Sequence, residues 1–310
     1  MKILITGGSG LVGCAIKEIS NNYDHEFIFS NSKECNLLDY EKTLNYVKKM
    51  KPDVIIHLAA MVGGLYKNMN FPVEMYENNI IINLNVLKIA HKCNVHNVIS
   101  CLSTCIFPDK TKYPINEEML NDGPPHESNF SYAYAKRMLE VHSKAYRKQY
   151  NRNYICIIPT NIYGPNDNFS LEEGHVIPSL IHKCYLNKIK NEDFEVKGTG
   201  IPLRQFIYSK DLAELIIWVM ENYKEGESII LSISEKEEVN IKRVAEIIAS
   251  NFNYQDRIIF NNKYSDGQYK KTADNKKLLD INNNFKFTDI EDGIKNTILW
   301  FKENYNSCRK

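Results

Sequence analysis

Residues 100–107 read SCLSTCIF and place a hydroxyl and two thiols at the end of an apolar run. Ser103 and Cys105 stand two positions apart, and Cys101 lies within the run just before them. A metal clamp is a poor interpretation, because no second Cys/His pair stands at the spacing of a zinc site. We therefore expect no metal, and we expect Cys101 to be an ordinary buried residue.

A Tyr-x-x-x-Lys pair follows at Tyr132 and Lys136. Positions i and i+4 share one face of a helix, so the ammonium can lie beside the phenol. We predict that its charge lowers the pKa of Tyr132 and makes the phenol a proton donor or acceptor. Such a short motif also occurs by chance, and Tyr134 with Met138 could form a structural pair instead. Ser103 at a strand end favours catalysis, because open α/β sheets bind ligands there.

A glycine-rich turn, GGSGLVG, occupies residues 7–13 after the first apolar run. Glycines at this place allow a tight turn and let the backbone approach a pyrophosphate, which then lies at a helix N-terminus. The turn predicts a dinucleotide, with contacts from each of its residues: Gly7, Gly8, Ser9, Gly10, Leu11, Val12 and Gly13.

The residues after the second predicted strand bear on which dinucleotide is bound. An NAD enzyme usually has a carboxylate there for the ribose, whereas this chain has Ser30-Asn31-Ser32-Lys33. These side chains can donate to a 2′-phosphate, so we predict NADP(H), although a solvated turn is the plain alternative. Further cofactor contacts are expected after the second, third and later strands, at Ser32, Lys33, Asn36, Leu37, Leu58, Ala59, Ala60, Pro159, Thr160, Asn161 and Ile162.

Strand-like and helical patterns alternate over the first half of the chain. Apolar runs at 2–6, 26–30, 53–58, 97–102 and 154–158 are separated by helical patterns at 11–20, 40–50, 74–93 and 132–149. This rhythm predicts a Rossmann-type doubly wound parallel sheet in an α/β protein. Beyond residue 165 the pattern loosens into loops and short elements, with helices expected at 209–223, 240–251 and 289–305 and a strand at 228–233.

The composition is that of an ordinary globular protein. The chain has 310 residues, 43% of them hydrophobic and 25% charged, with a formal net charge of +1. That charge gives no reason to expect nucleic acid or an anionic membrane as a partner. The eight cysteines form no paired framework, and we find no signal peptide or membrane-spanning run, so we expect a cytoplasmic protein with reduced thiols.

The glycine turn, Ser103, Tyr132 and Lys136 together resemble the extended short-chain dehydrogenase/reductase family. Longer blocks narrow the resemblance to its GDP-L-fucose synthase branch, the GDP-4-keto-6-deoxy-D-mannose 3,5-epimerase/4-reductases. These blocks are HLAAMVGGLYKN (57–68), SCLSTCIFPDKTKYPI (100–115), PTNIYGPNDNF (159–169), GHVIPSLIHK (174–183) and the stretch around RQF (204–206). The match runs from residue 1 to near residue 305.

The resemblance implies roles for the reactive residues. Ser103, Tyr132 and Lys136 match the residues that serve reduction, and Cys105 and His175 match those that serve two epimerisations. A C4 ketone acidifies the protons on C3 and C5, and one acid or base on each side of the sugar can exchange them. Lys136 and His175 are also expected to touch NADP(H). We leave His57, His126 and His182 as structural.

The resemblance further implies how the substrate is held and how the chain is divided. Substrate contacts are expected at Lys183, Arg204, Asp266 and Lys197, the last where some bacterial relatives carry Trp. We expect an NADP(H)-binding domain at 1–165, to which 205–233 return, and a smaller C-terminal α/β substrate domain at 166–310. The relatives form homodimers through helices that correspond to 74–93 and 132–149.

Three alternatives remain open from the sequence. A related GDP-sugar reductase or epimerase would act on a different sugar, such as a heptose or a dideoxy sugar. A UDP-sugar 4-epimerase would hold NAD and carry an acidic residue after the second strand. A non-catalytic NADP(H)-binding scaffold is disfavoured by the intact Ser, Tyr and Lys set.

Overall fold

The computed structural model describes residues 1–264, 266 and 268–310, and the chain forms two compact units. The first unit comprises Met1–Thr111, Glu117–Pro159 and Lys210–Leu231. The second comprises Lys112–Asn116, Thr160–Ser209 and Ser232–Lys310. Each unit therefore draws on segments that are far apart in the sequence.

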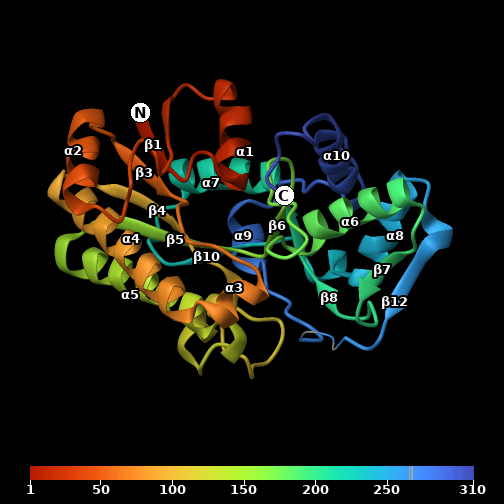
Figure 1. Ribbon diagram of the computed structural model, residues 1–310. Coiled ribbons are helices and arrows are strands. Elements are labelled where there is room, and N and C mark those ends of the chain that lie inside the picture. Colours follow the sequence, from red (N-terminus) through yellow and green to blue (C-terminus); the bar gives the residue numbers. More distant parts are fainter. Residues whose placement is uncertain (265, 267) are drawn as a thin grey trace. The chain divides into compact units, whose positions relative to one another are not determined.

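A six-stranded parallel sheet forms the centre of the first unit (Figure 1). Its order is β10-β5-β4-β3-β1-β2, and the strands are β1 Lys2–Thr6, β2 Glu26–Ser30, β3 Val54–His57, β4 Asn97–Cys101, β5 Asn153–Pro159 and β10 Ile229–Leu231. The chain winds from β1 to β2 in one direction and to β3, β4 and β5 in the other. Ligands bind such sheets beyond the carboxyl ends of the strands at this reversal. The predicted Rossmann-type fold is confirmed.

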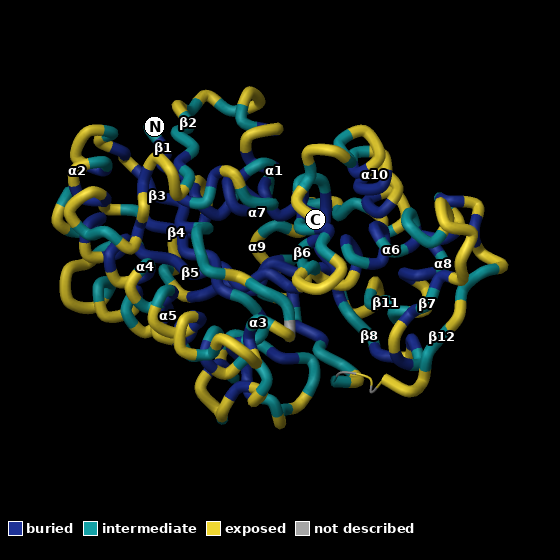
Figure 2. The backbone as a smooth tube through the Cα atoms, viewed as in Figure 1, coloured by how far each residue is buried: buried dark blue, intermediate teal, exposed yellow. Residues whose placement is uncertain are grey.

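Helices cover both faces of the sheet. Figure 1 shows α1 and α7 on one face and α4 with α5 on the other. The helices of this unit are α1 Leu11–Ile19, α2 Tyr40–Met50, α3 Leu65–Asn70, α4 Pro72–Lys92, α5 Phe130–Tyr150 and α7 Ser209–Asn222, with 3₁₀ turns η1 Ser20–Asn22, η2 Thr104–Ile106, η3 Glu117–Asn121 and η4 Glu127–Asn129. Figure 2 shows most residues of the central strands as buried, and β1, β3, β4 and β5 are buried along nearly their whole length, which explains why they read as continuous apolar runs.

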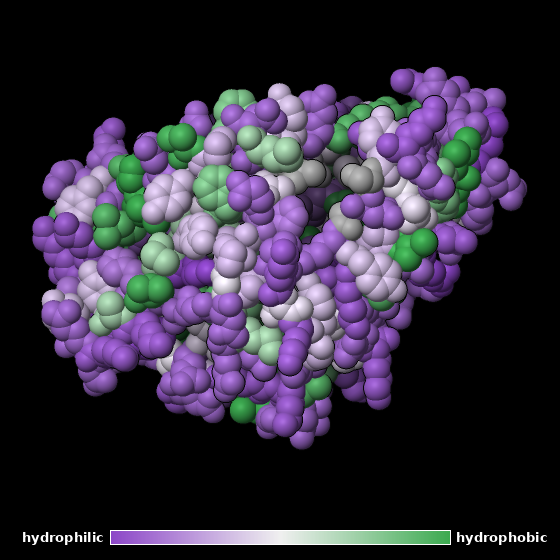
Figure 3. Space-filling model, turned by 90° about the horizontal axis from the view of Figure 1, so that it is seen from below, coloured by the Kyte–Doolittle hydropathy of each residue, from purple (hydrophilic) through white to green (hydrophobic). Residues whose placement is uncertain are grey.

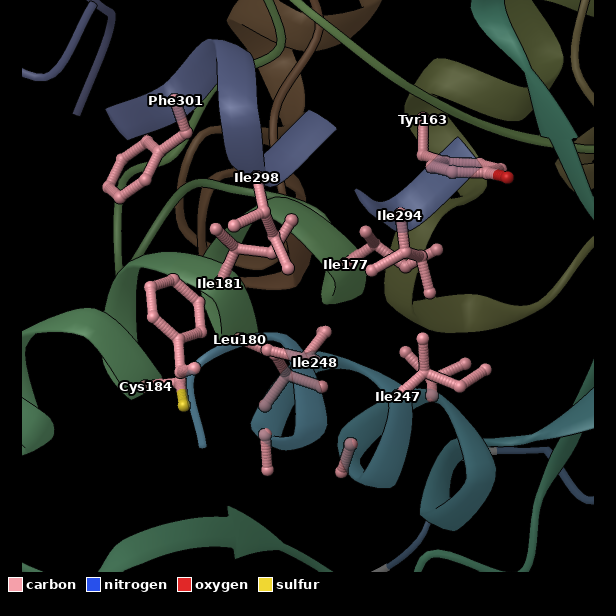
Figure 4. Close-up of a cluster of buried hydrophobic side chains, with 14 of the residues drawn as sticks. Tyr163, Ile177, Leu180, Ile181, Cys184, Ile247, Ile248, Ile294, Ile298 and Phe301 are labelled. Atoms are coloured by element: carbon pink, nitrogen blue, oxygen red, sulfur yellow. The ribbon is translucent and has the colours of Figure 1, made fainter. Parts of the chain in front are cut away.

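The described part of the second unit is built on short strand pairs and four helices. The pairs join β6 Asn161–Tyr163 to β9 Phe206–Tyr208, β7 Phe194–Lys197 to β12 Ile258–Asn261, and β8 Leu203–Arg204 to β11 Val239–Asn240. The helices are α6 Val176–Lys190, α8 Ile241–Asn251, α9 Lys276–Ile281 and α10 Ile290–Glu303, and the 3₁₀ turns are η5 Glu235–Glu237 and η6 Gln255–Arg257. Figure 4 shows side chains of α6, α8 and α10 converging on one apolar core.

Helix α6 is the main element that the sequence pattern did not predict. The pattern beyond residue 165 indicated loops and short elements, but Pro178, of a residue type that usually ends helices, is the third residue of this helix. A proline in the first turn removes an N–H that has no intrahelical acceptor, so the helix tolerates it. Among the described residues, no helix combines the length and the apolar character that a membrane crossing requires.

Candidate active site

Ser103 and Cys105 lie on one turn directly after β4. Ser103 is the N-cap of η2, and its hydroxyl accepts a hydrogen bond from the Cys105 amide at 3.4 Å. Both residues are half-buried, and the Cys105 thiol is in no disulfide within the described chain. The strand end thus holds a hydroxyl and a thiol in one short segment, as the SCLSTCIF run indicated. Cys101 is buried within the strand, as expected.

Tyr132 and Lys136 lie one turn apart on α5. The buried Lys136 Nζ is 5.9 Å from the centre of the Tyr132 ring and donates to the Cys101 carbonyl at 2.8 Å. The lysine therefore joins the catalytic helix to the end of β4. The expectation that Lys136 lowers the pKa of Tyr132 is wrong for this structure. Burial raises that pKa well above its usual value, and burial also lowers the pKa of Lys136.

The glycine turn between β1 and α1 has the shape of a dinucleotide cradle. Gly7 has φ +75°, and a Cβ atom on Gly8 would lie 2.7 Å from the Cβ of Phe29. A Cβ atom on Gly13 would overlap the Gly7 carbonyl and lie 2.6 Å from the Gly8 Cα. Within the described chain, α1 has no side-chain cap and no acidic residue in its first turn. Its N-terminus can therefore receive a pyrophosphate, so these residues fit NADP(H).

In the turn after β2, two residues predicted to bind the cofactor are exposed, and their neighbours are hydrogen-bonded within the protein. Ser32 and Lys33 are exposed, whereas the Ser30 hydroxyl is buried and donates to the Ile5 carbonyl. Asn31 uses its Oδ1 to accept from the Lys33 amide at 2.9 Å. Lys33 is thus the cation available for a 2′-phosphate. Of the next two predicted residues, Asn36 accepts from the Leu38 amide at 3.2 Å and Leu37 is buried.

The end of β3 is fixed by a buried polar chain. The Asn83 amide donates to the Ala135 carbonyl at 3.3 Å, so its Oδ1 accepts from His57 Nε2 at 3.1 Å. His57 Nδ1 then accepts from the Thr6 hydroxyl at 2.8 Å. This chain joins β1, β3, α4 and α5 and leaves His57 as a structural residue, as expected.

The predicted cofactor contacts Leu58, Ala59 and Ala60 follow directly after β3 and are half-buried. The Ala59 amide donates to the Thr6 hydroxyl at 3.4 Å. The same hydroxyl therefore links the polar chain at His57 to the segment that is expected to touch the cofactor.

The remaining predicted cofactor residues fall in both units. Pro159 ends β5 in the first unit, whereas Thr160, Asn161 and Ile162 belong to the second. Asn161 donates through its side chain to the Gln205 carbonyl at 2.9 Å.

His175 is the N-cap of α6 and belongs to the second unit. It is exposed, and its side chain makes no capping hydrogen bond to the described helix. The first unit brings Ser103, Cys105, Tyr132 and Lys136 together, and His175 is not among that group.

The four predicted substrate residues all lie in the second unit. Lys183 Nζ pairs with Glu195 at 3.3 Å, and Lys197 Nζ lies 4.8 Å from the centre of the Tyr264 ring. Both carboxylate oxygens of Asp266 accept from Thr199, at 2.9 Å from its amide and 2.6 Å from its hydroxyl. Arg204 is half-buried on β8, and burial lowers the pKa of its guanidinium. Lys183 and Asp266 are therefore already engaged within the protein.

Two residues that hold the surroundings of the predicted catalytic side chains were not predicted from the sequence. Asn83 fixes the His57 ring, and Arg137 donates to the carbonyls of Ile106 and Gly123. The position of Arg137 next to Lys136 was the available signal, but a lone arginine on a helix is usually a solvated one.

Comparisons with known proteins agree with this geometry. The sequence model described as the NAD dependent epimerase/dehydratase family matches residues 3–241. The chain is 49% identical to the GDP-L-fucose synthase of Dictyostelium discoideum and 47% identical to a probable GDP-L-fucose synthase of Drosophila melanogaster. These matches cover 99% and 100% of this chain and 97% and 99% of the relatives.

A solved structure shows the same fold. The GDP-L-fucose synthetase of Naegleria fowleri, crystallised with NADP, superposes with a TM-score of 0.95 at 45% identity, covering 100% of this chain and 95% of that one. The chain therefore belongs to the NAD dependent epimerase/dehydratase family, in the branch of the GDP-L-fucose synthases.

Proposed function

We propose that this enzyme converts GDP-4-keto-6-deoxy-D-mannose to GDP-L-fucose, by epimerisation at C3 and C5 followed by reduction at C4. One observation carries the proposal. The turn that bears Ser103 and Cys105 is tied through the Cys101 carbonyl to Lys136, on the helix that bears Tyr132. One strand end thus gathers groups that suit a ketone and its neighbouring carbons.

In this proposal Ser103 and Tyr132 bind the C4 oxygen. Their hydroxyls donate hydrogen bonds that stabilise the negative charge on this oxygen when a neighbouring proton is removed. Because burial raises the pKa of Tyr132, the phenol stays protonated near neutral pH and can give its proton to the C4 oxygen during reduction. When bound, NADPH supplies the hydride for that step.

Cys105 and His175 exchange the protons on C3 and C5. A thiol and an imidazole both change protonation near neutral pH when their surroundings favour it, so one can remove a proton while the other returns one to the opposite face. His175 stands at the N-cap of α6, where its ring is not held by a capping bond within the described helix.

We assign cofactor binding to the first unit and GDP-sugar binding to the second. The glycine turn and Lys33 support the first assignment. Half-buried Arg204 and the cation Lys197 support the second, since a diphosphate needs positive charge. Lys183 would contribute once it leaves its ion pair with Glu195. The predicted domains assign the two functions in the same way: NADP(H) binding to 1–165, with 205–233 returning to it, and GDP-sugar binding to 166–310.

We further propose a homodimer formed through α4 and α5. Large apolar side chains are exposed on both helices, at Val73, Tyr76, Ile81 and Leu84 on α4 and at Met138 and Val141 on α5. Figure 3, viewed from the side on which α4 and α5 lie in Figure 1, shows green hydrophobic groups among the purple polar ones. Exposed apolar surface of this kind favours association. Sedimentation should give a dimer that Leu84→Glu dissociates; a monomeric unmodified enzyme contradicts it.

We place the enzyme in the cytoplasm, where its cysteines, which form no disulfide within the described chain, stay reduced. Cell fractionation checks this location, and recovery with a secretory compartment would contradict it.

The decisive experiment incubates the enzyme with GDP-4-keto-6-deoxy-D-mannose and NADPH and assigns the product by NMR. We expect NADPH oxidation and the stereochemistry of GDP-L-fucose. A product reduced at C4 without inversion at C3 and C5 would indicate a reductase for another sugar. No NADPH oxidation would leave only a binding function.

A further inference from the structure

Arg137 follows Lys136 on α5, and its side chain is 5% exposed. Its guanidinium donates to backbone carbonyls. Nε donates to the Ile106 carbonyl at 3.0 Å, Nη2 donates to the same oxygen, and Nη1 donates to the Gly123 carbonyl at 2.9 Å. The centre of the group lies 5.4 Å from the centre of the Tyr134 ring.

This arginine is a buried cation without a carboxylate partner. Among the described residues, no acidic side chain lies within 4.0 Å of its guanidinium. Taking an unpaired charge out of water is costly, and burial lowers the pKa of Arg137 accordingly. A surface position for this side chain would avoid the cost, so its burial calls for a local reason.

The reason is that the adjacent cations Lys136 and Arg137 bind backbone carbonyls on either side of the reactive turn. Lys136 binds the carbonyl of Cys101, at the end of β4, and Arg137 binds the carbonyl of Ile106, at the end of η2. The segment between these two carbonyls carries Ser103 and Cys105. Helix α5 therefore grips both ends of the reactive turn with consecutive residues.

We propose that Arg137 is the positioning residue for epimerisation: it fixes the Cys105-bearing turn from its C-terminal end, through the Ile106 carbonyl. The inference rests on the proposed function. Lysine cannot replace the group fully, because only the planar fork of arginine reaches two carbonyls in a fixed geometry.

The test compares Arg137→Met and Arg137→Lys with Arg147→Met. Arg147 lies on the same helix, donates to the Tyr154 carbonyl at 2.6 Å and pairs with Glu140 at 3.4 Å, so it is a carbonyl-bonded control away from the turn. Each enzyme is given GDP-4-keto-6-deoxy-D-mannose in deuterated water without NADPH, and deuterium at C3 and C5 is followed by NMR. NADPH affinity, measured by fluorescence, reports folding.

We expect Arg137→Met to slow deuterium entry by roughly 10- to 100-fold, as misplaced catalytic groups do, with Arg137→Lys intermediate and Arg147→Met within about twofold of the unmodified enzyme. A second readout is the rate at which iodoacetamide alkylates Cys105 at neutral pH, followed by peptide mass spectrometry. Release of the turn in Arg137→Met should expose the thiol and speed its alkylation, whereas Arg147→Met should be alkylated at the rate of the unmodified enzyme.

Deuterium entry in Arg137→Met equal to that in Arg147→Met would overturn the proposal, and so would alkylation of Cys105 at the same rate in the two variants. If Arg137→Met fails to bind NADPH, Arg137→Lys decides: reduced deuterium entry supports the role and unchanged entry refutes it. If the unmodified enzyme itself takes up no deuterium, the proposed function fails and the role of Arg137 fails with it. That outcome is distinct from one in which the unmodified enzyme and the variants all exchange normally, which refutes the role of Arg137 alone.

Discussion

Lys136 and Tyr132 show how neighbours decide what a reactive side chain can do. The ammonium donates to the Cys101 carbonyl, so its first task is to fix α5 against the end of β4. The phenol is left in surroundings that raise its pKa. A phenol that keeps its proton near neutral pH is suited to donating it when a ketone is reduced. At this scale the chemistry follows from hydrogen bonds and burial rather than from the Tyr-x-x-x-Lys spacing alone.

Tyr132→Phe removes the proposed proton donor and leaves the ring. We expect NADPH oxidation with the keto sugar to fall by about 10²- to 10⁴-fold, the usual contribution of a general acid. NADPH affinity should be nearly unchanged, because the glycine turn and Lys33 are untouched. Absorbance assays and fluorescence titration measure the two quantities, and undiminished turnover would rule out the role of Tyr132.

Cys105→Ser replaces the thiol with a hydroxyl of similar size that ionises far less readily. We expect solvent deuterium to enter the sugar at least about 100-fold more slowly, as loss of a proton-transfer group predicts. The backbone amide at this position still donates to Ser103 after the substitution, so the turn should persist. Exchange at the unmodified rate, measured by NMR, would count against the thiol.

The β1–α1 turn illustrates how an element is specified by the space around it. Gly13 lies in the first turn of α1, where its missing side chain lets the helix pack against the Gly7–Gly8 backbone. The same close approach leaves the helix N-terminus clear for an anion. A small residue at one position therefore serves both packing and binding.

Gly13→Ala forces these two segments apart, since the added Cβ atom would lie 2.6 Å from the Gly8 Cα. We expect NADPH affinity to fall by at least about tenfold, because a displacement of about 1 Å in a binding turn is costly. Gly123→Ala is the matched control, as its Cβ atom would meet only Pro108, at 3.4 Å, among the described residues. Equal NADPH affinities for the two variants, measured by fluorescence, would refute this interpretation of the turn.

At the largest scale, a buried polar chain from Thr6 through His57 and Asn83 to Ala135 ties the sheet to two helices. His57 is fully buried, and burial lowers its pKa from 6.5 to about 3. The ring therefore stays neutral in the folded protein at pH values where it is protonated in the unfolded chain. Folding stability contributed by this site is complete above pH 6.5 and is lost as the pH falls toward 3.

His57→Gln tests this linkage. Between about pH 6.5 and 4.5, the unmodified protein should lose about 2 to 3 kcal/mol more of its free energy of unfolding than the variant does. Urea unfolding at several pH values measures the difference, and NADPH binding at neutral pH shows that the variant is folded. Parallel pH dependences for the two proteins would show that His57 is not the group responsible.

The sequence by itself determined the Rossmann-type sheet and the residues that could react. Continuous apolar strands and a glycine turn are local signals, because hydrophobic period and backbone sterics act over a few neighbouring residues. For the same reason Ser103, Tyr132 and Lys136 could be chosen from their types and spacing, whereas Cys105 was chosen only through the resemblance to the family. Helix α6 was not predicted, because proline breaks helices at most positions and is tolerated only in the first turn, where Pro178 lies.

Only the tertiary structure decided how these groups are held. The bond from Lys136 to Cys101 and the grip of Arg137 on Ile106 join residues 35 and 31 positions apart, and the raised pKa of Tyr132 depends on its burial. Sequence spacing cannot show which carbonyl a cation will reach or how much water a phenol keeps. Both depend on how helix and sheet pack, because desolvation and hydrogen bonding are properties of the folded surroundings.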